Sequence, residues 1–152
     1  MYYYITNYSA LEIRKKVELY RIKESIDLTP QLFINLVSST LYEHRFGPYF
    51  VSPVVIGLDI TDNYKPVVAG FDSIGCASQS GKFEVSGTSM EMLYGACEVF
   101  YKDKMNSDQV FETCSQCLLS AIERDCMSGW GAVVYVLTPG KITVKRLKCR
   151  QD

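Results

Sequence analysis

The residues most able to do chemistry in this sequence lie in the stretch ERDCMSGWGAVVYVL, residues 123–137. Asp125 and Ser128 stand three positions apart in a bend between a helix and an apolar strand, and a carboxylate beside a hydroxyl is a common component of catalytic centres. The same two residue types favour turns for structural reasons, because their side chains bond to nearby backbone groups. Gly129 favours a helix end, since glycine adopts a positive φ without strain. Two interpretations of this stretch therefore stay open: it supports a catalytic centre, or it is only a structural turn.

A second candidate is the CxxC motif formed by Cys114 and Cys117. Zinc requires about four nitrogen or sulfur ligands, but the sequence has no second CxxC, and its only histidine, His44, belongs to another helix. Both cysteines also continue the apolar face of their own helix, which favours packing over metal or redox chemistry. The hypothesis that the protein is a thiol-based metal or redox module depends on this motif alone.

His44 comes at the end of a predicted helix, where a cation is favourable. We interpret it as a capping or surface residue rather than a general base. The sequence has no GxSxG nucleophile elbow, and the glycines of GWG at 129–131 do not follow a strand, as a phosphate-binding loop would. A Ser-His-Asp or Cys-His arrangement stays open by composition, but no motif selects one.

The helices that position these residues are predicted from capping signals and apolar spacing. Ser9 with Glu12 has the spacing of a capping box, and Thr29 followed by Pro30 is a typical helix start. The first helix is predicted to end near Glu24, and the second before FGPYF. The four predicted helices begin, in order, at Ser9, Thr29, Thr88 and Ser107.

Strands fill the segments between and after these helices. Three are predicted before the third helix, the first two forming a hairpin around the turn TDNY, and a closing hairpin surrounds Pro139-Gly140. Because helices and strands come in blocks, the sequence predicts an α+β domain with mostly antiparallel pairing. The predicted strands cover residues 53–60, 65–72, 83–87, 131–138 and 141–149.

The composition of the 152-residue chain is that of a globular domain, with 47% hydrophobic and 22% charged residues. A net charge of −1 gives no reason to expect nucleic acid or anionic lipid as a partner. No apolar run is long enough to cross a bilayer, and the start of the sequence lacks the features of a signal peptide. We therefore expect a protein of the cytoplasm and nucleus with reduced thiols.

Several stretches resemble the beta subunits of the eukaryotic 20S proteasome core, a family of the peptidase T1 class. The resemblance covers roughly residue 16 to the end, and RFGPYF and SGWGAVVY look like the segments of fungal members. It divides the chain into a non-homologous N-terminal extension, residues 1–10, and a partial proteasome beta-type domain, residues 11–152. The resembling stretches are SSTLYEHRFGPYFVSPVVIGLD, VAGFDSIGC, FEVSGTSMEMLYGACE, FETCSQCLLSAIERD, SGWGAVVYVL and LKCRQD.

The resemblance implies a four-layer αββα sandwich of the N-terminal-nucleophile hydrolase type, here lacking the opening strands. Catalytic members use an N-terminal threonine whose own α-amino group accepts the proton, supported by an Asp and a Ser in a late turn. Asp125, Ser128 and Gly129 match that turn and are interpreted as its remnant. Neither Met1 nor Tyr2 can replace the nucleophile, and the resemblance is to a member understood as non-catalytic. We expect no catalytic residue and no small-molecule substrate.

The resemblance also implies a position for a hard cation at this turn. Ile122, Asp125 and Ser128 could bind Mg²⁺, mostly through backbone oxygens, joined by the terminal carboxylate of Asp152 from a facing subunit. Oxygen-only ligation suits Mg²⁺ or Ca²⁺. A bound water molecule is the alternative, and no other cofactor is expected.

The predicted function is that of a non-catalytic structural beta subunit of the 20S proteasome core, active in ring assembly and in ATP- and ubiquitin-dependent protein degradation. Its predicted partners are other proteasome alpha and beta subunits in a stack of heptameric rings, with no nucleic acid and no membrane. The alternative is a divergent N-terminal-nucleophile hydrolase processed from a longer precursor. Thr6 and Ser9 are its only early hydroxyl candidates, and neither follows a glycine.

The missing opening strands have a physical consequence. We expect the hairpins to keep unpaired edges and uncovered apolar faces, so that the chain needs partners to stay soluble. An incomplete gene model is the preferred explanation of the short N-terminus, with a true short isoform as the alternative.

Overall fold

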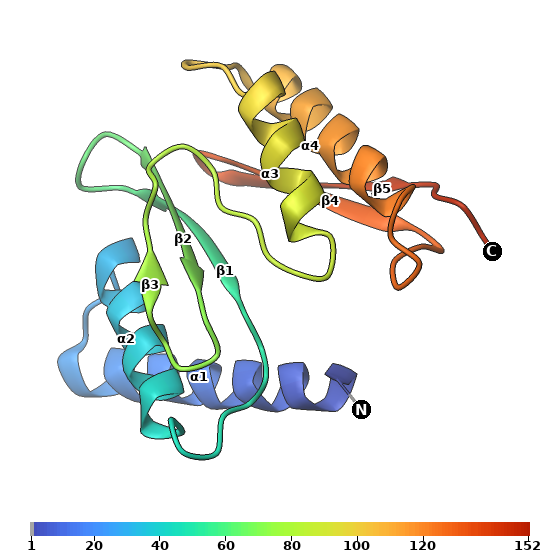
Figure 1. Cartoon of the computed structure of the whole chain (residues 1–152). Coiled ribbons are helices and arrows are strands. Elements are labelled where there is room, and N and C mark those ends of the chain that lie inside the picture. Colours follow the sequence, from blue (N-terminus) through green and yellow to red (C-terminus); the bar gives the residue numbers. More distant parts are fainter. Residues whose placement is uncertain (1) are drawn as a thin grey trace. The chain divides into compact units, whose positions relative to one another are not determined.

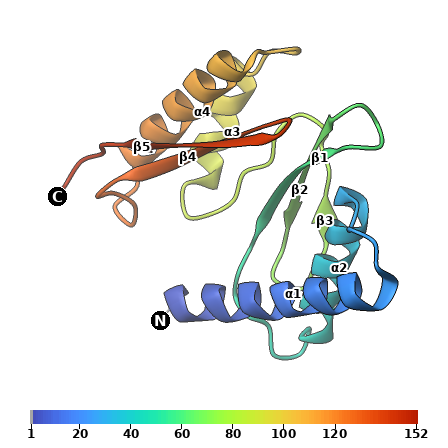
Figure 2. The same ribbon diagram turned by 180° about the vertical axis from the view of Figure 1, so that it is seen from behind.

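The protein is described by a computed structural model that covers the backbone of residues 2–152 and the side chains from residue 7 onward. The chain divides into two compact units, unit 1 (Met1–Glu84) and unit 2 (Val85–Asp152). Figures 1 and 2 show the elements of each unit from opposite sides. Unit 1 contains α1 (Tyr2–Glu24), α2 (Pro30–Glu43), β1 (Val54–Asp59), β2 (Lys65–Phe71) and β3 (Ala77–Ser78). Unit 2 contains α3 (Met90–Phe100), α4 (Ser107–Ile122), β4 (Ala132–Thr138) and β5 (Lys141–Leu147).

Helix α1 begins at Tyr2, seven residues before the predicted start at Ser9, so that prediction is wrong. The residues before Ser9 include neither Gly nor Pro, and nothing in their backbone therefore prevents the helix from continuing toward the N-terminus. Ser9 lies inside the helix and is buried rather than capping it.

Helix α2 begins as predicted. The hydroxyl of Thr29 accepts a hydrogen bond from the backbone N–H of Leu32 at 3.3 Å, and Pro30 occupies the first helical position. The Leu32 side chain, in the first turn of α2, is exposed (43%). The packed face of α2 begins with Phe33 and Ile34, directly after Leu32.

The hairpin of β1 and β2 is confirmed. The two strands pair antiparallel, from Val54 opposite Gly70 to Asp59 opposite Lys65. The β1 strand lies at one edge of the three-stranded sheet, whose order is β1-β2-β3.

The third strand is in a different place from the prediction, because β3 forms at Ala77–Ser78 and not at residues 83–87. The side chain of Glu84 accounts for the difference. Its carboxylate accepts hydrogen bonds from the Ser80 N–H at 2.8 Å and the Ser78 hydroxyl at 3.1 Å. Residues 83–87 are thus joined to the β3 region through a side chain instead of a backbone ladder.

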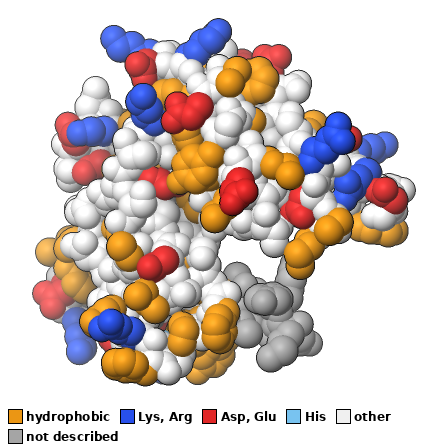
Figure 3. Space-filling view, viewed as in Figure 1, with side chains coloured by type: hydrophobic (Ala, Val, Ile, Leu, Met, Phe, Trp, Pro, Cys, Tyr) orange, Lys and Arg blue, Asp and Glu red, His pale blue; other side chains and the backbone are white. Residues whose placement is uncertain are grey.

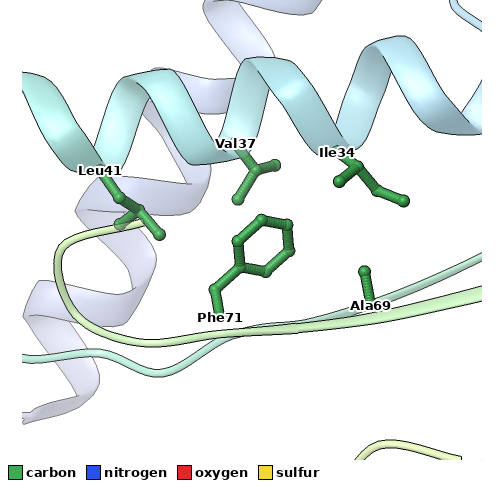
Figure 4. Close-up of a cluster of buried hydrophobic side chains, with 5 residues drawn as sticks. All are labelled: Ile34, Val37, Leu41, Ala69 and Phe71. Carbon is green, nitrogen blue, oxygen red and sulfur yellow. The ribbon is translucent and has the colours of Figure 1, made fainter. Parts of the chain in front are cut away.

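The core of unit 1 lies between α2 and the sheet. Ile34, Val37 and Leu41 share one face of α2, as their spacing of three and four residues requires. They point toward Ala69 and Phe71 of β2 (Figure 4). Burying apolar side chains of this size contributes roughly 1.5–3 kcal/mol each. This cluster therefore holds α2 against β2.

The starts of both helices in unit 2 differ from the predicted caps. Ser89, not Thr88, is the N-cap of α3, and its side chain makes no capping hydrogen bond. Asn106, not Ser107, caps α4. Its side chain accepts from the Gln109 N–H at 2.9 Å, and the Gln109 side chain accepts from the Asn106 N–H at 3.0 Å.

The closing hairpin is confirmed, with β4 and β5 paired antiparallel around Pro139-Gly140. Helices α3 and α4 cover one of its faces (Figures 1 and 2). Val134 is buried on that face. The other face presents four exposed apolar side chains, which we call the outer face of the hairpin: Val133, Tyr135, Ile142 and Val144.

The predicted α+β class is confirmed, because each unit combines two helices with antiparallel strands. The stacking of both units into four layers stays a prediction. No described helix is long and apolar enough to cross a membrane.

Candidate functional site

The candidate site is centred on Asp125, which is buried in the turn that follows α4. Its carboxylate accepts hydrogen bonds from three hydroxyls, those of Ser128 (2.6 Å), Ser89 (2.7 Å) and Thr88. It also accepts from the backbone N–H of Met127 at 3.0 Å. The turn and the start of α3 are therefore joined through one side chain.

These hydrogen bonds determine the charge of Asp125. The Ser128 hydroxyl, followed by those of Thr88 and Ser89 and the Met127 N–H, holds the pKa of the Asp125 carboxyl well below its usual range. An ionised carboxylate with so low a pKa is a weak proton acceptor at neutral pH. The arrangement can orient hydroxyls and stabilise a turn, but it is poorly suited to general-base catalysis.

The sequence pointed to Asp125 and Ser128, and the structure brings them together. It did not point to Thr88 and Ser89 as their partners, because the spacing predicts a helix cap at Thr88 and indicates no role for Ser89. The sequence feature that could have indicated these partners is the pair of adjacent hydroxyl residues before α3. A capping role and a role in a buried network use the same residue types, so only the contact with Asp125 separates them.

A third part of the site, Arg150, was missed altogether. Its guanidinium donates to the backbone carbonyl oxygens of Glu123 (2.8 Å), Asp125 (2.5 Å) and Ser128 (3.4 Å). In addition, the Trp130 N–H donates to the Arg150 carbonyl oxygen at 2.9 Å. The C-terminal segment is thus tied to the turn through both the side chain and the backbone.

Gly129 does not have the conformation that the sequence predicted. The left-handed residue of the turn is Trp130, with φ of 64°, while Gly129 is not among the residues of positive φ. The hydrogen bond from Trp130 to Arg150 holds this backbone conformation, which a bulky residue rarely adopts. The contact with Arg150 therefore places the left-handed conformation at Trp130 and not at the neighbouring Gly129, where the sequence predicts it.

Three of the predicted cation ligands can be placed, whereas the fourth, the terminal carboxylate of Asp152 from a facing subunit, stays a prediction. The carbonyl oxygens of Asp125 and Ser128 face the Arg150 guanidinium. The carbonyl oxygen of Ile122 accepts from the Asp125 N–H at 3.2 Å. Asp152 Oδ1 lies 3.2 Å from Arg150 Nε, an ion-pair distance without an aligned hydrogen bond. Two of the predicted carbonyl ligands, those of Asp125 and Ser128, thus already accept from a guanidinium, while Mg²⁺ binding itself stays a prediction.

The other sequence candidates lie away from this turn. His44 is the C-cap of α2, as predicted, and its Nε2 lies 2.7 Å from the Tyr49 hydroxyl. Tyr49 also donates to Glu12 of α1, and burial together with this hydrogen bond raises the pKa of Tyr49 above its usual range. These contacts tie α1 to the end of α2. Of the two early hydroxyls, Ser9 is buried in α1 and the side chain of Thr6 lies outside the described residues.

The CxxC cysteines differ from each other. Cys117 is buried between the elements of unit 2, as predicted, whereas Cys114 is exposed, so its predicted place in the core is wrong. Burial, with a smaller effect of Cys117, raises the pKa of the Cys97 thiol to about 12. Within the described residues, no group of three or more His, Cys, Asp or Glu side chains is placed to hold a metal ion.

Known proteins resemble most of this chain. The family model for proteasome subunits matches residues 6–137. The chain is 52% identical over 139 residues to the probable proteasome subunit beta type-3 of Schizosaccharomyces pombe and 49% identical over 139 residues to proteasome subunit beta type-3 of Saccharomyces cerevisiae. Each match covers 91% of this chain and 67% of the relative. Proteasome subunit beta type-3-A of Arabidopsis thaliana is 49% identical over 147 residues, covering 97% of this chain and 70% of the relative.

Proposed function

Because the chain belongs to the proteasome subunit family, we propose that it serves as a non-catalytic structural beta subunit of the 20S proteasome core. The observation that carries this proposal is the similarity to beta type-3 subunits along nearly the whole chain, at about half of all positions. In this role the protein takes part in ring assembly and in ATP- and ubiquitin-dependent protein degradation, in the cytoplasm and nucleus.

The absence of catalytic activity follows from the same similarity. Beta type-3 subunits are non-catalytic components of the proteasome. The low pKa of Asp125 agrees with a structural turn, because the carboxylate is fully engaged by hydroxyl and amide donors. Both points favour the structural role over a processed N-terminal-nucleophile hydrolase.

The surfaces of both units support a role in assembly. The outer face of the hairpin in unit 2 exposes Tyr135 (60%) and Ile142 (63%), and β1 in unit 1 exposes Ile56 (54%). Hydrophobic side chains lie among the charged ones on the visible surface (Figure 3). Exposed apolar patches of this kind mark protein contacts, and obligate interfaces bury on the order of 2,000–5,000 Å².

The proposed partners are other proteasome alpha and beta subunits in a stack of seven-membered rings. Contacts with two different ring neighbours and with the opposite ring require several distinct apolar surfaces on one subunit, and both units present such side chains. Assembly removes them from water, which is the main favourable term in association.

Purification of the affinity-tagged chain from its own organism tests this function. We expect native mass spectrometry to find the chain in a 20S particle, together with the other alpha and beta subunits. An epoxyketone probe should label catalytic subunits of that particle and leave this chain unlabelled. A chain that is recovered alone, or that reacts with the probe, would contradict the proposal.

A further inference from the structure

We propose that the guanidinium of Arg150 is the resident cation of the turn after α4, in the place where the resemblance led us to expect Mg²⁺. This inference concerns contacts within unit 2 and does not depend on the proposed function. It assigns to an internal side chain a task that the sequence had suggested for a metal ion.

The first argument is the direction of the carbonyl groups. Helix α4 ends at Ile122, and the last carbonyl groups of a helix carry partial negative charge and lack partners within the helix. The carbonyl oxygen of Glu123, the C-cap residue, accepts from the Arg150 guanidinium at 2.8 Å, and that of Asp125, in the turn beyond the helix, accepts at 2.5 Å. The guanidinium therefore places a positive charge at the helix end, where it is favourable.

The second argument is competition for the same oxygens. The guanidinium contacts the carbonyl oxygens of Asp125 and Ser128, two of the predicted ligands, and lies beside the side-chain carboxylate of Asp152 in the same chain. Mg²⁺ requires oxygens at about 2.0–2.1 Å in octahedral geometry, and a guanidinium that donates to two of these oxygens occupies part of the space that such a shell needs. Two positive groups in this space would also repel each other.

The third argument is the chemistry of arginine. Its guanidinium stays charged at every physiological pH and presents donors in a rigid plane, which suits several fixed acceptors. The Arg150 Nε is buried, although part of the side chain remains accessible. The tie between the C-terminal segment and the turn therefore persists without metal and across the physiological pH range.

Amide hydrogen exchange of the full chain, followed at residues 125–130, tests this inference. In the wild-type chain we expect millimolar Mg²⁺ to leave these exchange rates unchanged. Arg150→Met keeps a long side chain but removes the charge and donors, and it should accelerate their exchange about tenfold or more, since hydrogen bonds to a charged group are lost. Arg146→Met, on the exposed side of β5, is the matched control and should leave the rates unchanged.

Two results would overturn the inference. One is saturable slowing of exchange at residues 125–130 by Mg²⁺ in the wild-type chain, because it would show that a metal reaches the carbonyl oxygens. The other is equal exchange in Arg150→Met and Arg146→Met. Should Arg150→Met fail to fold, Arg150→Lys replaces it, and acceleration is again expected because an ammonium cannot reach all three carbonyl oxygens at once. The wild-type Mg²⁺ titration decides independently of any variant.

Discussion

Thr40 offers the sharpest test of the packing of unit 1. Its side chain is fully buried on α2, and its hydroxyl has no hydrogen-bond partner among the described residues. An unsatisfied buried polar group costs about 1–3 kcal/mol, and valine has almost the same shape without the hydroxyl. Allowing for some crowding by the new methyl group, we expect Thr40→Val to stabilise the fold by about 1–2 kcal/mol.

The assay is urea unfolding combined with native-state hydrogen exchange of the α2 amides. With a slope of about 1–3 kcal/mol per molar urea, the midpoint should rise by roughly 0.3–2 M, and exchange should slow by a factor of about 5–30. Ser38→Ala is the matched control, because the Ser38 hydroxyl donates to the Gly75 carbonyl oxygen at 2.6 Å. Loss of this hydrogen bond should lower the free energy of unfolding by about 0.5–1.5 kcal/mol. If Thr40→Val also lowers stability at an unchanged slope, the Thr40 hydroxyl has an acceptor in solution and the reasoning is refuted.

Three further predictions concern charge, association and thiol chemistry. The folded-state pKa of Asp125 is depressed, so its contribution to stability is complete above its unfolded value of about 3.9 and is lost as the pH falls through the folded value. In Asp125→Asn, the free energy of unfolding should therefore fall less steeply as the pH drops below about 4. An equally steep fall in the variant and the wild type would contradict this. Ile142→Lys places a charge on the outer face of the hairpin and should reduce recovery of associated subunits about tenfold, whereas Lys141→Glu, at the start of the same strand, should not. The raised pKa of Cys97 predicts slow alkylation at pH 8 in peptide mapping, at least about tenfold slower than that of exposed Cys126; equal rates would show that the Cys97 thiol is not protected.

The predictable part of the fold was the part that local signals control. The cap of α2 at Thr29 and the closing turn at Pro139-Gly140 depend on residues within a few positions of each other, and both are confirmed. The pairing of Asp125 with Ser128 belongs to the same class, since the two residues share one turn. Short sequence separation lets residue type and spacing determine the contact.

The errors arose where a distant group competed with a local preference. Thr88 and Ser89 have residue types suited to helix capping, but they bond to Asp125, which lies 37 and 36 positions away. In the same way, residues 83–87 have strand-like composition, but the Glu84 carboxylate joins them to the β3 region through its side chain.

By itself, the sequence determined the α+β class, the order of helices and hairpins, the resemblance to proteasome beta subunits and the turn around Asp125. Only the tertiary structure decided which groups surround that turn, above all that Arg150, 25 positions from Asp125, donates to its carbonyl oxygen. The physical reason is that a guanidinium can satisfy backbone carbonyl groups anywhere it can reach. Carbonyl groups are present in every residue, so no side-chain pattern in the sequence marks those that Arg150 contacts.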